Sequence, residues 1–398
     1  MAKVVLAYSG GLDTSVAVHW LKAEKGMDVV TLSADLGQGE YIEPIGEKAL
    51  EIGAASAHVS DLKEKFVEEF LLPGLKAGAV YEEGYPLATA FGRPLIAAEL
   101  VKVAREEGCQ YVAHGCTGKG NDQVRIESSV AALAPELEII APLREWSMKS
   151  RDEEIAYCEE NDIPIEITRE KPYSYDRNIW GVSIECGALE DPWNSPPEDA
   201  YLMTVNPEEA PDEPVEVTVG FEKGVPSSLD GEEMAPLEVI SRLNDLGGKH
   251  GVGRIDQVEN RLVGIKSREV YEAPAALILH RALEALTSLV WGRDLAHFTG
   301  VLSERYSRLV YDGRWFTPLR ESIDAFFRKA HEVSTGRIRC RLYKGSCTVT
   351  GRRSPLSLYE ENLATYTPQD TFDHTAAEGF IKIWPLPLKG EARQKKGE

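Results

Sequence analysis

The stretch K-V-V-L-A-Y-S-G-G-L-D-T-S, residues 3–15, decides how the first part of this chain folds. Its apolar run at residues 4–7 predicts a buried strand, and Ser9-Gly10-Gly11 predicts a tight turn into a helix. Glycines let a ligand approach the backbone, and the first N–H groups of a helix are free to bind an anion. Asp13 is unexpected in such a site, because a carboxylate repels phosphate unless a cation lies between them. The stretch therefore predicts either a phosphate site that also holds a cation or a plain turn in which Asp13 caps the helix.

Strands and helices alternate from this stretch to about residue 165. Residues 29–34 and Tyr111–His114 read as further buried strands, and residues 14–25 as a helix that Gly26 ends. Such alternation is typical of a parallel sheet with helices on both faces, which binds ligands at the carboxyl ends of its strands. We therefore predict an α/β nucleotide-binding domain with a doubly wound parallel sheet in residues 1–165.

The pattern changes after residue 165. Apolar and polar residues alternate in a strand predicted at residues 215–221 and in a hairpin around residues 338–346, and apolar helices are predicted at 274–291 and 323–333. These elements predict a second, α+β domain over residues 166–353. Residues 354–398 contain one predicted short amphipathic helix and too little apolar material for a core, so we expect an oligomerisation arm that packs on another domain or subunit.

The composition is that of an acidic globular enzyme. Hydrophobic residues make up 43% of the chain, and 44 basic against 65 acidic residues give a net charge of −21. Such a surface repels nucleic acid and anionic membranes. The six cysteines form no C-x-x-C pair, which favours reduced thiols over zinc ligands. Because the chain also lacks an N-terminal basic and apolar segment and any run of about eighteen apolar residues, we expect a soluble, cytoplasmic protein with no membrane or nucleic-acid partner.

A second polar motif, H-G-C-T-G-K-G-N-D-Q-V-R at residues 114–125, follows the strand predicted at Tyr111–His114. Its three glycines expose backbone, and five polar side chains crowd the carboxyl end of the strand. Asn121 and Arg125 are four residues apart and so share a helix face. A guanidinium binds a carboxylate through two donors, and an amide both donates and accepts. The motif favours a site for a small carboxylate-bearing substrate over a solvated loop.

The first motif resembles the phosphate loop of the ATP pyrophosphatases, which cleave ATP between its α and β phosphates. It lacks the lysine of the Walker pattern G-x-x-x-x-G-K-[ST]. Together with residues 114–125, K-H-G-V-G-R-I-D-Q-V-E-N-R-L-V-G-I-K-S-R-E-V-Y-E at 249–272 and S-P-L-S-L-Y at 354–359, it makes nearly the whole chain similar to the argininosuccinate synthase family. The resemblance implies a homotetrameric ligase that uses ATP and Mg²⁺ to join citrulline to aspartate through a citrullyl-adenylate, and that releases AMP and pyrophosphate.

The resemblance also implies roles for individual residues. Asp13 would hold Mg²⁺ against the phosphates. The chemistry of the residue type, rather than the resemblance, makes Asp122 a second catalytic candidate, as a hypothetical acceptor of a proton from the aspartate amine. The ATP site would be lined by Ala7, Tyr8, Ser9, Gly10, Gly11, Leu12, Asp13, Thr14, Ser15, Ala34 and Gly115. Aspartate would be held by Thr117, Asn121 and Asp122, with Lys119 as a further donor. Citrulline would be held by Tyr85, Asn121, Arg125, Ser174, Ser183, Glu259 and Tyr271. Many relatives carry a serine that contacts citrulline at the position of Ala90, so Ala90 itself would contribute only through its backbone.

Two other functions remain open on the sequence. An ATP pyrophosphatase that modifies tRNA would carry zinc-type cysteine pairs or a basic face, and the sequence shows neither. A non-catalytic nucleotide sensor would not need a large second domain or the polar loop at 114–125.

Structural explanations also exist for single residues. Asp35, at the end of a predicted strand, is either a turn residue or part of the ATP site. Tyr85 and Tyr271 are explained equally well as half-buried aromatics, and Glu259 as a solvated charge on a helix.

Overall fold

The computed structural model describes residues 1–39, 43–82, 84–164 and 173–397. They divide into two compact units, Met1–Leu356 and Ser357–Glu398, and each is described by itself. The domain boundary predicted between residues 165 and 166 lies outside the described residues. The limits 1–165, 166–353 and 354–398 therefore stay predictions.

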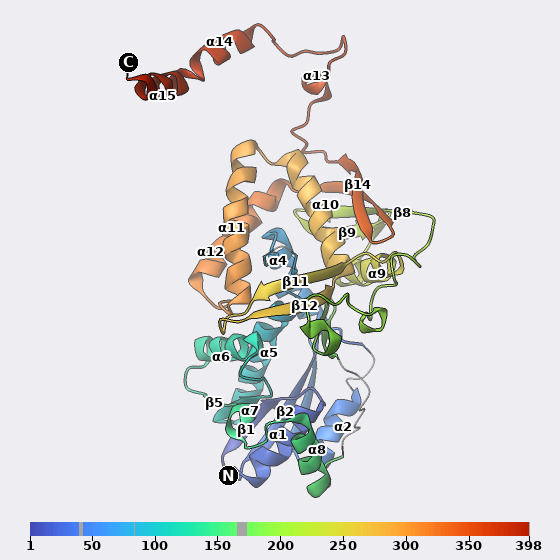
Figure 1. The fold of residues 1–398 in the computed structure, drawn as a ribbon, viewed down its shortest axis with the longest axis vertical. Helices are drawn as coiled ribbons and strands as arrows, with labels where there is room; N and C mark the ends of the chain where they lie inside the picture. Colours follow the sequence, from blue (N-terminus) through green and yellow to red (C-terminus); the bar gives the residue numbers. More distant parts are fainter. Residues whose placement is uncertain (40–42, 83, 165–172, 398) are drawn as a thin grey trace. The chain divides into compact units, whose positions relative to one another are not determined.

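A five-stranded parallel sheet organises the first part of the chain (Figure 1). The strand order is β3-β2-β1-β4-β5. After β1, the chain adds β2 and β3 on one side of β1, and it then adds β4 and β5 on the other side. This is the predicted doubly wound arrangement. The elements are β1 (Lys3–Ala7), α1 (Leu12–Ala23), β2 (Asp28–Asp35), α2 (Glu43–Ile52), β3 (Ser56–Asp61), α3 (Lys63–Phe66), a π-helical turn (Val67–Leu71), α4 (Leu72–Lys76), α5 (Ala88–Glu107), β4 (Tyr111–His114), α6 (Asn121–Leu133), β5 (Glu138–Ile140), α7 (Pro142–Glu145) and α8 (Arg151–Glu160).

Helices cover both faces of this sheet, which is why its central strands are apolar without alternation. Val4 and Leu6 of β1 pack with residues of α1, α2 and α8 on one face. Val5 of β1 packs with residues of α5 and α6 on the other face. The carboxyl ends of the central strands β1 and β4 lie at the same end of the sheet, because the strands are parallel. Each of these two strands leads directly into one of the two polar motifs.

Two antiparallel sheets and long helices form the rest of the first unit. One sheet has the order β10-β9-β8-β13-β14 and the other β11-β12-β7-β6. The elements are β6 (Ser174–Asn178), β7 (Gly181–Glu185), two 3₁₀ turns (Gly187–Glu190 and Glu198–Ala200), β8 (Val215–Glu222), β9 (Val225–Leu229), β10 (Glu232–Glu233), α9 (Pro236–Lys249), β11 (Arg254–Asn260), β12 (Lys266–Glu272), α10 (Pro274–Val290), α11 (Arg293–Tyr311), α12 (Pro318–Ala330), a 3₁₀ turn (His331–Val333), β13 (Gly336–Tyr343) and β14 (Ser346–Arg353).

The strand predicted near residue 215, the hairpin near residue 340 and the helix predicted at 274–291 are confirmed as β8, β13 with β14, and α10. Helix α11 was not predicted. All six cysteines carry free thiols, as expected. Among the described residues, no helix has the length and apolar character needed to cross a membrane.

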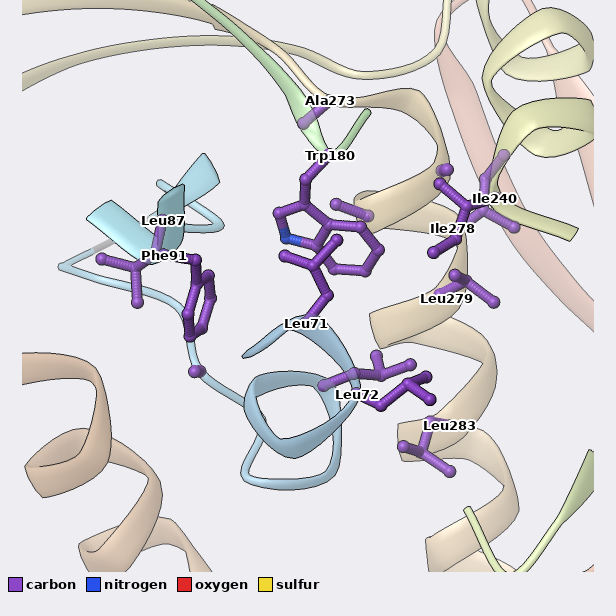
Figure 2. Packing of buried hydrophobic residues seen from close by; sticks show 14 of the residues in the cluster. Leu71, Leu72, Leu87, Phe91, Trp180, Ile240, Ala273, Ile278, Leu279 and Leu283 are labelled. Atoms are coloured by element: carbon purple, nitrogen blue, oxygen red, sulfur yellow. The ribbon is translucent and has the colours of Figure 1, made fainter. Parts of the chain in front are cut away.

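Helix α5 belongs to two cores at once. Its first half, from Ala88 to Leu95, packs in the large core of the second part of the unit, and Ala97 to Ala104 pack on the parallel sheet. Trp180 lies in the large core together with Leu71 and with Ile278 and Leu279 of α10 (Figure 2), and its indole N–H donates to the carbonyl of Pro86 at 2.9 Å. Shared packing of this kind explains why residues 1–356 form one compact unit.

The described part of the second unit, residues 357–397, contains three helices, α13 (Glu361–Ala364), α14 (Ala376–Ile383) and α15 (Leu386–Lys396). The sequence predicted one short helix and a tail, which is wrong. Pro385 and Pro387 do not prevent α15, because they lie at its N-cap and in its first turn, where a helix needs no N–H donor. None of the three helices buries a residue.

Candidate functional site

The turn between β1 and α1 is open to an anion. Gly10 has a φ of +77°, a left-handed conformation that glycine adopts without strain. The N-cap of α1 is Gly11, which has no side chain to satisfy the first N–H groups. Within the described residues, the backbone N–H groups of Leu12, Asp13 and Thr14 have no hydrogen-bond partner. Three donors at the positive end of the helix dipole suit a phosphate.

Hydroxyl groups surround this turn, and some of them are partly exposed whereas others are buried beneath it. Ser9 Oγ lies 3.1 Å from Thr14 Oγ1, and the N–H of Gly11 donates weakly to Ser9 Oγ at 3.4 Å. Ser15 is fully buried, and its hydroxyl lies 3.3 Å from that of Tyr8, which is buried as well. Ser9 and Thr14 are therefore placed to meet a ligand, whereas Tyr8 and Ser15 hold the turn.

The second motif meets this turn at the edge of the sheet. β1 and β4 are neighbours, with Ala7 opposite His114, and the strand order reverses its direction between them. A Cβ at Gly115 would lie 2.8 Å from Cγ2 of Thr14, so only glycine fits there. The two motifs therefore lie side by side at the position where doubly wound sheets bind their ligands.

Asp13 lies in the first turn of α1 and is not its N-cap, so the capping explanation is wrong. Its carboxylate neighbours Glu154 of α8. Burial, together with the nearby charge of Asp13, raises the pKa of Glu154 to about 8. Among the described residues, the buried Oε2 of Glu154 has no hydrogen-bond partner. A divalent cation between the two carboxylates would satisfy this oxygen and remove their repulsion.

Asp35 serves the local structure, as one of the two explanations predicted. Its Oδ1 accepts from the N–H of Gly37 at 2.8 Å, and its Oδ2 forms an ion pair with Lys63 at 2.5 Å. Ala34, the residue before it, accepts from the side-chain amide of Gln38 through its carbonyl at 2.7 Å.

Asn121 and Arg125 lie at the start of α6 and are both buried. Asn121 donates to the Tyr311 hydroxyl at 2.8 Å and accepts from the N–H of Leu262 at 2.9 Å. Arg125 donates through Nε to the carbonyl of Tyr311 at 2.9 Å. Its Nη2 is buried without a partner in the described part of the chain. A buried guanidinium with a free donor suits a carboxylate ligand.

Gly313 lets the end of α11 approach Arg125 closely. It has a φ of +69°, and a Cβ at this position would lie 2.8 Å from Cα of Arg125. Thr117 and Lys119, by contrast, are exposed in the loop before α6. The loop thus offers accessible donors at its tip and buried ones at its base.

Asp122 is bound by two arginines. Arg93 Nη2 lies 2.7 Å from one carboxylate oxygen and Arg125 Nη1 lies 2.9 Å from the other. Burial alone would raise the pKa of Asp122, but the two guanidinium charges lower it below its usual value. Arg93 also binds Asp176 of β6. A carboxylate stabilised in its charged form is a weak base, which argues against a proton-accepting role for Asp122 and favours a positioning role.

Glu259 lies at the centre of a cluster of tyrosines. It accepts hydrogen bonds from the hydroxyls of Tyr271 and Tyr311, each at 2.7 Å. Tyr85 stacks on Tyr271 with a centroid separation of 4.1 Å. Glu259 is 3% exposed and belongs to β11, and both Tyr85 and Tyr271 are fully buried. The explanations of these residues as a solvated helix charge and as half-buried aromatics are therefore wrong.

The remaining residues predicted to bind citrulline lie at different distances from the tyrosine cluster. Ser183 lies opposite Tyr271 on one side and Asp176 on the other, next to the tyrosine cluster. Ser174 is exposed at the other end of its hairpin, opposite Glu185. Ala90 is buried, and its N–H already donates to the Tyr85 hydroxyl at 3.3 Å. Ala90 therefore acts on the cluster through Tyr85.

Sequence reasoning missed several residues that contact the predicted ones, among them Tyr311, Arg93 and Glu154, and it missed Asp176, which binds Arg93. Tyr311 ends α11, whose apolar residues were not recognised as a helical pattern. Arg93 stands in A-F-G-R-P, where a charge inside an otherwise apolar helix was an available signal. The partners of Asp176 and Glu154 come from distant parts of the chain, so their sequence neighbours gave no signal.

Two protein-family models together match most of the chain. A family model described as the arginosuccinate synthase N-terminal HUP domain matches residues 3–164, and one described as the arginosuccinate synthase C-terminal domain matches residues 173–391. The chain belongs to the argininosuccinate synthase family. Its resemblance to that family and the predicted fold class are thereby confirmed.

Similar members of the argininosuccinate synthase family cover the whole chain. The argininosuccinate synthase of Aquifex aeolicus is 58% identical over 100% of this chain and 99% of its own length. That of Halalkalibacterium halodurans is 55% identical over 97% and 94%. A solved structure titled as a predicted subunit of tRNA methyltransferase from Methanocaldococcus jannaschii is 16% identical over 40% of this chain and 76% of that chain. Its TM-score of 0.29 is too low to show a shared fold.

Proposed function

We propose that the protein joins citrulline to aspartate at the expense of ATP, and that it forms argininosuccinate, AMP and pyrophosphate at the edge of the parallel sheet. Membership of the argininosuccinate synthase family, at 58% identity over the full chain, carries the ATP-dependent condensation itself. The observation that supports the location is the contact of Gly115 with Thr14, which brings the open turn of α1 next to the loop leading to Arg125.

ATP would lie along the turn from Ala7 to Ser15, with Ala34 and Gly115 beside it. The free N–H groups at the start of α1 would bind phosphate oxygens. The pair Asp13 and Glu154 fits Mg²⁺, because both are hard oxygen donors and one buried oxygen lacks a partner. A bound Mg²⁺ would neutralise the repulsion between these carboxylates and the phosphates.

Citrulline would occupy the cluster around Glu259. Its carboxylate would bind the free Nη2 of Arg125, and its ammonium group would bind Glu259, which is already fixed by two tyrosine hydroxyls. Tyr85, Asn121, Ser183 and Tyr271 would complete this pocket, with the exposed Ser174 at its margin. Aspartate would bind nearer the loop, through Thr117, Asn121 and Lys119, while Asp122 orients the two arginines.

The chemistry follows from the electronic structure of citrulline. Two nitrogens donate into the ureido carbonyl, so its oxygen is nucleophilic and its carbon is a poor electrophile. In the proposed reaction this oxygen attacks the α phosphate, and pyrophosphate leaves toward the turn of α1. The aspartate amine then attacks the ureido carbon, the carbon–oxygen bond breaks, and AMP departs with that oxygen. The chain contributes positioning and stabilisation of the departing charge.

We further propose that the protein is a homotetramer in which the segment Ser357–Glu398 packs on a neighbouring subunit. The helices of this segment bury no side chain of their own, and Phe380, Ile383 and Trp384 are all more than half exposed. A segment with this many exposed apolar side chains is typical of an interface.

Pyrophosphate release tests the proposed function directly. We expect continuous release from ATP only when citrulline and aspartate are both present, and citrulline carrying ¹⁸O in its ureido group should deliver the label to AMP. Label in pyrophosphate would contradict the adenylate route. Release that depends on tRNA would support a tRNA-modifying enzyme, and ATP binding without release would support a nucleotide sensor.

A further inference from the structure

The turn after β1 lacks the lysine of a Walker loop, but another helix supplies one. Lys48 of α2 places its Nζ 2.7 Å from the carbonyl oxygen of Gly10. We propose that the Lys48 ammonium binds the β and γ phosphates of ATP and then the departing pyrophosphate. This inference rests on the proposed function and assigns the cation that the chain itself contributes to that site.

The position of Lys48 is fixed by the packing of α2. Ile45, three residues earlier, approaches the turn so closely that a Cβ at Gly10 would lie 3.4 Å from its Cγ1. A Cβ at Gly46 would lie 3.2 Å from Cγ2 of Val59, which holds α2 against β3. Ala49 is fully buried in the core beneath. Because residues on both sides of Lys48 are fixed, its side chain is directed over the turn.

The charge of Lys48 is available to a ligand. Lys25 forms an ion pair with Glu145, and Lys63 with Asp35 and Asp61, as expected in a chain with a net charge of −21. Within the described residues, Lys48 has no ion pair, and Nζ donates to the Gly10 carbonyl alone. The side chain is partly exposed, so an anion can reach it. A neutral carbonyl is a weaker partner for an ammonium than a phosphate oxygen, so ATP would displace it.

Lys48 and Glu154 belong to helices that pack in one core. Ala49, next to Lys48 on α2, and Cys158, one turn after Glu154 on α8, lie in the same buried cluster. An ammonium is a compact charge on a flexible stem, which can follow a phosphate group as it leaves. With the cation expected at the acidic pair, Lys48 would stabilise the negative charge that develops on pyrophosphate.

Binding measurements distinguish this role from simple support of the turn. Lys48→Gln keeps a donor for the Gly10 carbonyl and removes the charge, whereas Lys48→Arg keeps the charge. We expect calorimetry with Mg²⁺ to show that Lys48→Gln binds inorganic pyrophosphate and ATP about tenfold or more weakly, while AMP binds within about twofold of wild type. Lys48→Arg should retain most of the affinity for pyrophosphate.

Lys22→Gln is the matched control, because the exposed Lys22, in the last turn of α1, also donates to a glycine carbonyl, that of Gly53 at 3.2 Å. Its affinities should equal those of wild type. Unchanged pyrophosphate binding by Lys48→Gln, or equal losses for AMP and ATP, would overturn the inference. Neither result would affect the proposed function, which fails only if the wild-type protein does not form argininosuccinate from citrulline and aspartate.

Discussion

At the scale of single residues, the substitution Asp13→Asn tests whether the function of this residue depends on its negative charge. Asp13→Asn removes the charge, and because Gly11 is the N-cap, the helix should not lose stability. We expect pyrophosphate formation to slow by about a hundredfold or more, with partial recovery at high Mg²⁺ and an unchanged melting temperature. Asp245→Asn, an exposed change on α9, is the control. Turnover close to that of wild type would remove Asp13 from the metal site.

Arg125 tests the placement of citrulline. Arg125→Lys keeps a positive charge and loses the free Nη2 and the fork geometry. We therefore expect the citrulline KM to rise by about tenfold or more while the ATP KM changes little. Steady-state kinetics with each substrate varied in turn measure both values, and the exposed Arg105→Lys on α5 serves as the comparison. Equal losses for ATP and citrulline would mean that Arg125 only supports the loop.

At the scale of elements, the turn after α12 makes stability depend on pH. His331 is buried; burial lowers its pKa to about 4, and its Nε2 lies 2.9 Å from the carbonyl of Lys76. Its ordinary value is about 6.5, so the unfolded chain binds the proton more readily than the folded chain. The neutral imidazole of His331 therefore contributes at most about 3 kcal/mol to the free energy of unfolding. This contribution is complete above pH 6.5 and is lost as the pH falls toward 4.

Denaturant unfolding at pH 7 and pH 5 measures this contribution. His331→Gln cannot take up the proton, so its free energy of unfolding should fall less between the two pH values than that of wild type. The exposed His297→Gln on α11 should behave as wild type does. Parallel losses in wild type and His331→Gln would show that other groups cause the acid sensitivity.

The secondary-structure elements differ in how well the sequence alone predicted them. The strand Tyr111–His114 was predicted residue for residue because glycines mark both of its ends: Gly108 ends the helix before it and Gly115 follows it. Helix α11 was not predicted. Its buried residues gather in its second half and include the polar side chains of Tyr306 and Ser307, so the helix shows no continuous apolar face in the sequence. Asn121 and Arg125 stand in one motif and could be identified there. Tyr311, which binds both, lies 190 residues after Asn121, and only the tertiary structure joins them.

At the scale of the whole molecule, the segment Ser357–Glu398 decides the proposed assembly. Deleting it should reduce the molar mass in solution below that of a tetramer, because its exposed apolar side chains would no longer cover a neighbour. Light scattering on the purified protein measures the mass. The full-length double variant Phe380→Ala, Trp384→Ala, which removes one pair of neighbouring exposed rings, should weaken the tetramer as well. A truncated protein that stays tetrameric would contradict the proposal.

The close contact of Gly313 and Tyr311 with α6 also constrains how this chain can be recombined with its relatives. The two matched regions, residues 3–164 and 173–391, each contribute one side of that contact. A hybrid gene that takes each region from a different species would keep the pocket only if the second parent has glycine at 313 and a tyrosine at 311. A side chain at 313 would push Arg125 away, whatever the identity of the other residues in the pocket. Substitutions at 125, 311 and 313 should therefore be inherited together, as a covarying set.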